Sequence, residues 1–283
     1  MNRKVADAES LTVSYTPPVL AEIRREKVKG TDPARFLLDG SSEMEQSESY
    51  AKLRMNLLYT LAGKETKAVA VSSAIAGEGK STITANLAIS CAMSGKKVLL
   101  VDADIRRACQ RDHFKYAEDA PGLSEILIGE TAWQYAVISS GRENLDILPA
   151  GHAAPNPAEL LSLPTLSTAL AEMEQQYDLI LFDTPPINVV SDPLALSSYV
   201  AGCVMVIRQN YSDHREIRKA LVSAEMAGMN VLGFVFYGEK LKQGKYYGKK
   251  YYEKYYSRYE KQAQISSIPT NTEAGVKYRR RSK

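Results

Sequence analysis

The chain has 283 residues, 45% of them hydrophobic, which is enough to bury a full core in one or two domains. A net charge of +3 excludes nucleic-acid binding over the whole surface, and three isolated cysteines argue against a disulfide framework or a zinc or iron–sulfur site. No run approaches about 18 uninterrupted apolar residues, so we expect a cytoplasmic protein without a membrane-spanning helix.

The N-terminal part is predicted to be a polar extension followed by a helix. Residues 1–42 mix polar residues with proline and glycine, which indicates weak structure. Apolar side chains then recur three or four residues apart, at Tyr50, Leu53, Leu57 and Leu61. This spacing predicts an amphipathic helix.

Residues 67–236 alternate short apolar runs with longer helical patterns. The runs are nearly continuous, which is typical of parallel strands covered on both faces, so we predict an α/β fold with a mostly parallel, doubly wound sheet. Asn156 and Pro157 predict a helix start, with asparagine as the N-cap. The predicted strands are 68–73, 97–104, 145–150, 178–184, 203–208 and 231–236, and the main predicted helices are 80–94, 157–176 and 213–227.

The apolar pattern stops after Tyr237. Tyr, Lys, Gly and Glu dominate residues 238–261, and the remaining residues are mostly polar. We therefore predict a flexible, basic, tyrosine-rich tail over 238–283, behind a P-loop domain over 43–237 and the polar extension over 1–42.

The segment AIAGEGKS, residues 74–81, matches the P-loop pattern, with Ala74 in place of the first glycine. It lies between a predicted strand and a predicted helix, so backbone N–H groups and the helix dipole can hold phosphate oxygens. Lys80 would reach the β- and γ-phosphates of ATP, and the Ser81 hydroxyl would bind Mg²⁺. The predicted ATP-binding residues are Ala76, Gly77, Glu78, Gly79, Lys80, Ser81 and Thr82.

Three carboxylates follow two other predicted strands. VLLVDADIRR places Asp102 and Asp104 at one strand end, and LILFDTPP places Asp183 at another. Ligands of open α/β sheets bind at this carboxyl edge, where three acidic groups would repel one another without a cation. One such aspartate is more often a helix cap, but three beside a P-loop predict an ATP–Mg²⁺ site.

Together, SSAIAGEGKST, VLLVDADIRR and LILFDTPP resemble the motifs of the bacterial tyrosine kinases of capsule and exopolysaccharide export. The segment LPAGHAAPNPAELL, residues 148–161, and the run from DTPP to Asp192 support the match, which covers about residues 45–237 in order. The resemblance implies an ATP-dependent protein-tyrosine kinase whose fold is similar to that of septum-site and partition ATPases.

Carried over by position, the resemblance implies that Lys80 and Ser81 are the Walker A ligands of phosphate and Mg²⁺. Asp102 and Asp104 would form the Walker A′ motif, with Asp102 near the metal and Asp104 as the base or a second metal-shell residue. Asp183 would be the Walker B acid and a metal-site residue.

The chain departs from the family pattern at two places. The family usually has proline where this chain has Ala76. Its oligomerisation motif, E-x-x-R-x-x-R, is matched by Glu48 and Arg54 but has Ala51 in the middle. The resemblance still implies a homo-oligomer, such as a ring, that uses Glu48 and Arg54.

The resemblance also implies partners. One is a separate transmembrane activator of the polysaccharide chain-length type, which would recruit the kinase to the inner face of the membrane. Another is a cognate phosphotyrosine phosphatase. The implied role is regulation of capsule or exopolysaccharide synthesis and export.

Seven tyrosines lie among basic residues between positions 246 and 259. A four-residue repeat also fits an amphipathic helix, although Gly244, Gly248 and the lack of aliphatic residues weaken that alternative. Stacking of single-stranded nucleic acid is disfavoured because the rest of the chain offers no matching basic groove. The resemblance implies that these tyrosines are autophosphorylation sites: Tyr246, Tyr247, Tyr251, Tyr252, Tyr255, Tyr256 and Tyr259.

The alternative function is a non-kinase ATPase switch of the partition or septum-site type, with the tail as an interaction module. Such proteins carry a signature lysine at the second P-loop position, which reaches across a dimer. This chain has Ile75 there, and an apolar side chain cannot supply that charge. The sequence therefore favours the kinase.

Overall fold

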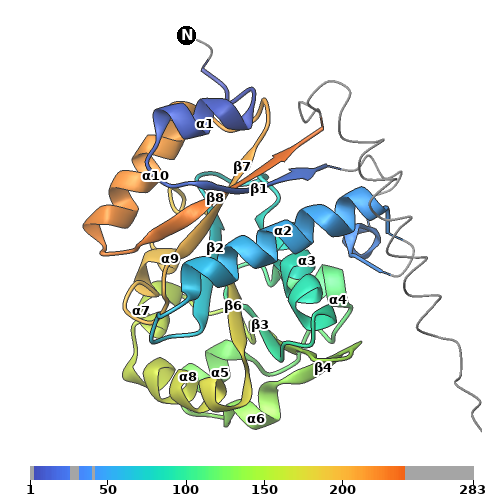
Figure 1. Ribbon diagram of the computed structural model, residues 1–283. Coiled ribbons are helices and arrows are strands. Elements are labelled where there is room, and N and C mark those ends of the chain that lie inside the picture. Colours follow the sequence, from blue (N-terminus) through green and yellow to red (C-terminus); the bar gives the residue numbers. More distant parts are fainter. Residues whose placement is uncertain (1–2, 26–31, 40–41, 240–283) are drawn as a thin grey trace, which may run out of the picture. The chain divides into compact units, whose positions relative to one another are not determined.

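A computed structural model describes residues 3–25, 32–39 and 42–239 (Figure 1). Within these ranges, eight strands form one sheet in the order β1-β8-β7-β2-β6-β3-β5-β4. All neighbouring pairs are parallel except β4 with β5. The strands are β1 (Val19–Arg24), β2 (Ala68–Ser73), β3 (Val98–Asp102), β4 (Ile138–Arg142), β5 (Leu145–Leu148), β6 (Leu179–Asp183), β7 (Cys203–Arg208) and β8 (Val231–Gly238).

Successive side chains of the central strands enter two apolar layers, one on each face of the sheet. In β2, Ala68 and Ala70 pack in the layer with α1, α8 and α10, whereas Val69 and Val71 pack in the layer with α2 and α3. The predicted doubly wound α/β architecture is confirmed (Figure 1). The described helices are α1 (Ala8–Ser14), α2 (Met44–Leu61), α3 (Lys80–Met93), α4 (Cys109–Phe114), α5 (Leu123–Leu127), α6 (Trp133–Ala136), α7 (Pro157–Leu161), α8 (Pro164–Gln176), α9 (Asp192–Ala195) and α10 (His214–Met226), with one 3-10 turn, η1 (Pro33–Phe36).

The expectation of weak structure throughout residues 1–42 is wrong. Helix α1 begins after Asp7, whose side chain accepts a hydrogen bond from the Ser10 N–H at 3.0 Å. Strand β1 then adds to the sheet parallel to β8, and the Pro18 carbonyl accepts from the Phe234 N–H at 2.8 Å. Proline is tolerated beside this strand because β1 lies at the edge of the sheet.

The single helix expected over residues 157–176 is two helices, α7 and α8. Pro164 begins α8, because a proline inside one long helix would lack an N–H donor and clash with the preceding turn. Pro157 opens α7 as predicted. Asn156 occupies the N-cap position, but its side-chain amide donates to Glu159 at 3.1 Å instead of capping the helix.

The strand order brings the predicted site residues to one edge of the sheet. Strands β2, β6 and β3 are adjacent in the centre. Asp102, at the end of β3, pairs in register with Asp183, at the end of β6. The P-loop leaves β2 beside them, so a turn, a helix N-terminus and the carboxylates converge there.

Candidate functional site

The P-loop connects β2 to α3 and depends on two glycines. Gly77 has a φ of 83° and Gly79 a φ of 95°, both in the left-handed region that favours glycine. A Cβ atom on Gly77 would lie 2.9 Å from the Tyr211 hydroxyl oxygen, and one on Gly79 would lie 2.7 Å from a ring carbon of Tyr237. The backbone conformation and the lack of space therefore both favour glycine at these two positions. With no side chains there, an anion can approach the backbone N–H groups at the start of α3.

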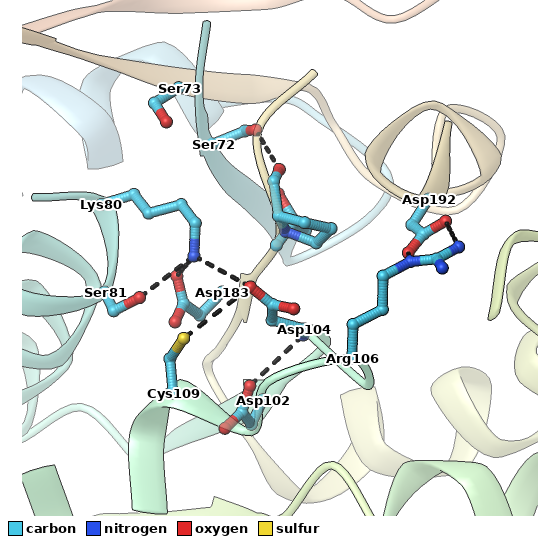
Figure 2. Close-up of polar contacts among 12 residues, drawn as sticks. Ser72, Ser73, Lys80, Ser81, Asp102, Asp104, Arg106, Cys109, Asp183 and Asp192 are labelled. Carbon is cyan, nitrogen blue, oxygen red and sulfur yellow. Dashed lines mark hydrogen bonds and ion pairs between the residues drawn. The ribbon is translucent and has the colours of Figure 1, made fainter. Parts of the chain in front are cut away.

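Lys80 points its ammonium group into the carboxylates at the sheet edge (Figure 2). Its Nζ atom lies 3.1 Å from Ser81 Oγ, 3.4 Å from Asp104 Oδ2 and 3.7 Å from Asp183 Oδ1. Burial alone would lower the pKa of Lys80, but the nearby carboxylates, Asp183 first, raise it above its ordinary value. The group is therefore a fixed positive charge within reach of a phosphate bound at the P-loop.

Asp102 is fully buried and held by three donors. Its Oδ2 accepts from the Gln110 N–H at 2.7 Å and from the Tyr116 hydroxyl at 3.1 Å, and its Oδ1 accepts from the Asp104 N–H at 3.3 Å. Burial, and next the charge of Asp183, raise the pKa of Asp102. A cation in the site would offset both effects.

Asp104 differs from Asp102 in having a free oxygen. Its Oδ2 faces Lys80, while its Oδ1 is buried and has no hydrogen-bond partner among the described residues. The side chain is 2% exposed and lines the cavity in front of the P-loop. A buried acceptor without a donor costs about 1–3 kcal/mol, so this atom is suited to a ligand that brings a proton or a positive charge.

Gln110 and Tyr116 were not predicted from the sequence. The Gln110 side-chain amide donates to Asp183 Oδ2 at 2.7 Å and to the Ser81 carbonyl at 3.1 Å, so it ties the end of β6 to the start of α3. Neither residue belongs to a motif with a recognisable spacing. The packing of α4 against α3 brings Gln110 to the carboxylates, and Tyr116 follows α4.

The acidic groups fit a divalent metal that shares its ligands with a nucleotide. Within the described ranges, no three His, Cys, Asp or Glu side chains are arranged to hold a metal by themselves. Mg²⁺, however, commonly takes one or two carboxylates together with waters and substrate phosphates. The Ser81 hydroxyl and the buried carboxylates of Asp102 and Asp183 provide that kind of hard oxygen donor beside the P-loop.

Arg106 and Asp192 form an ion pair at the margin of the site (Figure 2). The guanidinium donates to both carboxylate oxygens, with Nε 2.8 Å from Oδ2 and Nη2 3.0 Å from Oδ1. Asp192 is fully buried, and a buried carboxylate needs such a partner. The pair connects the turn after β3 to the beginning of α9. The segments that contain Arg106 and Asp192 were recognised in the sequence, but the ion pair between them was not predicted.

Residues 208–212, at the end of β7 and directly after it, hold the P-loop by hydrogen bonds to its carbonyl groups. Arg208 donates to the Gly77 carbonyl at 2.8 Å, and the Tyr211 hydroxyl donates to the Ala76 carbonyl at 3.0 Å. The Arg208 guanidinium also stacks on the Tyr211 ring, 4.7 Å from its centroid. These contacts hold the carbonyl groups of Ala76 and Gly77 away from the phosphate site. The N–H groups of the loop are then free to face a bound phosphate.

Glu78 is the buried centre of this fastening. Its carboxylate accepts from the Ile75 N–H at 2.9 Å and from the Ser212 hydroxyl. Burial raises the pKa of Glu78 to about 7 despite these donors. The residue therefore supports the loop from behind, whereas the sequence placed it only among nucleotide-binding positions.

We expect the unfolding free energy of the wild type to fall relative to that of Glu78→Gln as pH rises from about 5 to 8. The folded state holds the Glu78 proton more tightly than the unfolded state, so stability is lost as the carboxyl ionises. The pKa shift predicts a relative change of about 2 kcal/mol. Urea unfolding across this pH range measures it. Exposed Glu130→Gln is the control, and parallel wild-type and Glu78→Gln profiles would contradict the prediction.

Of the remaining predicted residues, Thr82 lines the cavity of this centre, Glu48 and Arg54 lie on another helix, and the others lie outside the described ranges. Thr82 lies at the start of α3, with its hydroxyl 3.2 Å from His113 Nε2. Glu48 and Arg54 lie on α2, where Arg54 donates to the Ser90 carbonyl at 2.6 Å. All seven predicted phosphoacceptor tyrosines, and nearly all of the predicted tail, lie outside the described residues, and the predicted domain boundaries stay predictions.

No helix in residues 3–25, 32–39 and 42–239 combines the length and apolar composition needed to cross a bilayer.

Comparisons with known proteins agree with this geometry. Residues 66–214 match the model of the AAA domain family. The chain is 37% identical to the tyrosine-protein kinase YwqD of Bacillus subtilis over 202 residues, which is 71% of this chain and 85% of that protein. It is 31% identical to the tyrosine-protein kinase CpsD of Streptococcus pneumoniae over 199 residues, 70% of this chain and 87% of that protein. The kinase domain of the Escherichia coli tyrosine kinase ETK superposes with a TM-score of 0.71 at 26% identity, covering 82% of this chain and 93% of that domain.

Proposed function

This chain belongs to the bacterial tyrosine kinases, and from that premise we propose that it transfers the γ-phosphate of ATP to tyrosines in its own segment 246–259. One observation carries the proposal: a buried ammonium group and three carboxylates meet at the phosphate-binding turn. Catalysis of phosphoryl transfer consists mostly of positioning and charge neutralisation, and this arrangement supplies both.

Lys80 and the P-loop hold the transferring phosphate in this proposal. The Lys80 ammonium neutralises charge on the β- and γ-phosphates, and the first N–H groups of α3 bind their oxygens. Ser81, Asp102 and Asp183 would hold Mg²⁺, which supplies further charge neutralisation when bound. Gln110 keeps Asp183 and the start of α3 in register with each other.

Asp104 receives the acceptor hydroxyl. The tyrosyl oxygen attacks the γ-phosphorus, the bond from that phosphorus to the bridging oxygen breaks, and ADP leaves with that electron pair. The phenolic proton passes to Asp104, whose Oδ1 is buried and unpartnered among the described residues. Because a tyrosyl hydroxyl has a pKa near ~10, this proton moves late in the reaction.

Asp104→Asn is expected to lower the rate of phosphotyrosine formation about 100-fold. The amide keeps the shape of the side chain but cannot take up the proton, so the loss belongs to transfer more than to ATP binding. Single-turnover assays with labelled ATP measure the rate, and equilibrium titration measures the Kd for ATP. Asp112→Asn changes an exposed aspartate on α4 and serves as the control. A rate for Asp104→Asn within threefold of wild type would exclude Asp104 as the base.

The decisive experiment incubates the purified chain with labelled ATP and Mg²⁺ and reads the product for phosphotyrosine. The kinase yields labelled tyrosine within residues 246–259, identified by peptide mapping. A non-kinase ATPase switch would release phosphate without labelling the protein. Kinases of this kind often require a membrane-anchored activator, so the reaction is repeated with such an adaptor before an unlabelled product is taken as evidence against the kinase.

The cellular setting extends the proposal. A transmembrane adaptor of the polysaccharide chain-length type would recruit the kinase to the inner face of the membrane, and a phosphotyrosine phosphatase would reverse the modification. Copies would assemble into a homo-oligomer through α2, with Glu48 and Arg54 at the contact. The cycle of phosphorylation would regulate synthesis or export of capsule or exopolysaccharide.

A further inference from the structure

The lining of the cavity in front of the P-loop has two chemically different parts. Its volume is about 290 Å³. One part of its lining is polar and includes Lys80, Ser81 and Asp104, which the proposed chemistry uses. Another part is apolar and belongs to residues 184–190, which follow β6 and are called the valine turn here. Its cavity-lining residues are Pro185, Pro186, Val189 and Val190.

The valine turn is fixed to the end of β2 and to α10. The Thr184 N–H donates to the Val71 carbonyl at 3.1 Å, and the Ile187 N–H donates to the Ser73 carbonyl at 2.9 Å. The side-chain amide of Asn188 donates to the Glu216 carbonyl at 2.9 Å. Its position is therefore set before any ligand arrives, as a specificity wall requires.

Val189 is 61% exposed at the tip of this fixed turn, although it borders a cavity whose lining also includes charged side chains. A phosphate or a metal gains nothing from an apolar wall, so this part of the lining calls for an apolar group. Asp104 lines the same cavity, and its buried Oδ1 lacks a partner among the described residues and calls for a hydrogen-bond donor. A phenol carries both: an apolar ring and a hydroxyl donor at its end.

We propose that the valine turn, mainly through Val189, is the seat for the aromatic ring of the acceptor tyrosine. The inference rests on the proposed function and adds the residues that distinguish tyrosine from serine or threonine. A ring against Val189 would carry a hydroxyl that Asp104, in the same cavity, can accept from, whereas serine and threonine have no ring to contact this apolar surface.

The occupant is a tyrosine of segment 246–259. That segment follows β8, and Tyr237 of β8 lies against Gly79 of the P-loop. The chain from Glu239 to Tyr246 can span at most about 25 Å, so the first of these tyrosines is tethered to the end of β8 by a short segment. The tail is rich in tyrosine but has no phenylalanine or tryptophan between residues 238 and 283. Any benzene-type ring that the tail places against Val189 is therefore that of a tyrosine.

Binding of short peptides to the full-length chain tests the seat apart from catalysis. In this chain the seven tyrosines of segment 246–259 and Tyr278 are replaced by alanine, so that no tail ring competes, and the chain is saturated with MgADP. The probe peptide is residues 248–254 with Tyr251→Ala and Tyr252→Phe, which keeps one ring and removes the hydroxyl. The same peptide with Tyr252→Ala is the blank. We expect the phenylalanine peptide to bind, and Val189→Asn to raise its Kd about fivefold.

Three variants of the chain separate the outcomes. Val189→Ile keeps an apolar side chain and should retain the wild-type Kd, while Val222→Asn changes a valine of similar exposure on α10 and should have no effect. The same peptide with Tyr252 kept as tyrosine can accept phosphate. Val189→Asn should also raise the KM for this tyrosine peptide about fivefold. An unchanged Kd for the phenylalanine peptide, or an equal rise in the Kd for MgADP, overturns the proposal. A chain that binds this peptide but labels no tyrosine contradicts the proposed function and leaves the ring seat supported.

Discussion

Replacing Lys80 with methionine is expected to lower phosphotyrosine formation about 1,000-fold. Methionine has a similar length but no charge, so the phosphates lose the ammonium that is held among the carboxylates. The Lys80 side chain is 11% exposed, and its Nζ lies within 4 Å of both Asp104 and Asp183. Because this ammonium group is buried, water screens its attraction for a bound phosphate only weakly.

A second consequence of this change concerns the carboxylates themselves. Without the ammonium, the carboxylates of Asp102, Asp104 and Asp183 lose their positive partner and repel a bound phosphate more strongly. Lys80→Arg separates the effect of charge from that of shape, because it restores the charge in a planar group that fits this narrow space poorly.

The measurement for both variants is the initial rate of phosphotyrosine formation at saturating ATP, with thermal unfolding to confirm folding. Lys64→Met alters an exposed lysine before β2 and should leave the rate unchanged. We expect about 100-fold loss for Lys80→Arg, between that of methionine and wild type. If Lys80→Met keeps more than a tenth of the wild-type rate, Lys80 does not act on the transferring phosphate.

The sequence predicted the centre of this fold better than its margins, for a physical reason. Strands β2, β3, β6 and β7 are buried on both faces, so each is a continuous apolar run that stands out in the chain. Strands β1 and β4 lie at the two edges, where one side faces water and the run is broken by polar residues. Such short mixed segments do not differ in composition from loops.

The candidate site divides in the same way. Lys80, Asp102, Asp104 and Asp183 could be placed together because each belongs to a motif and the carboxyl ends of parallel strands share an edge. The residues that support these four side chains could not be predicted from the sequence. Gln110 meets Asp183 across 73 positions of sequence, and no local spacing encodes that contact. Prediction from sequence therefore identifies groups that act on a ligand more readily than groups that hold them in place.

Replacing all seven tyrosines of segment 246–259 with phenylalanine is expected to remove autophosphorylation of that segment and to keep the oligomer assembled in ATP. Residues 240–261 contain eight basic and two acidic side chains, a net charge of +6. Each phosphate adds roughly −1.5 to −2, so full modification would bring this segment to roughly −4 to −8. A segment attracted to acidic surfaces on a neighbouring copy would then be repelled by them.

Sedimentation of wild type and variant, with and without ATP and Mg²⁺, measures the effect. We expect ATP to weaken wild-type association at least about tenfold, which corresponds to about 1.4 kcal/mol, and to leave the phenylalanine variant unchanged. Tyr135→Phe removes an exposed tyrosine outside the tail and should behave as wild type. Added salt should narrow the difference, because repulsion between exposed charges is screened. A phenylalanine variant that assembles and disassembles like wild type would show that nucleotide turnover, and not the charge of the tail, controls assembly.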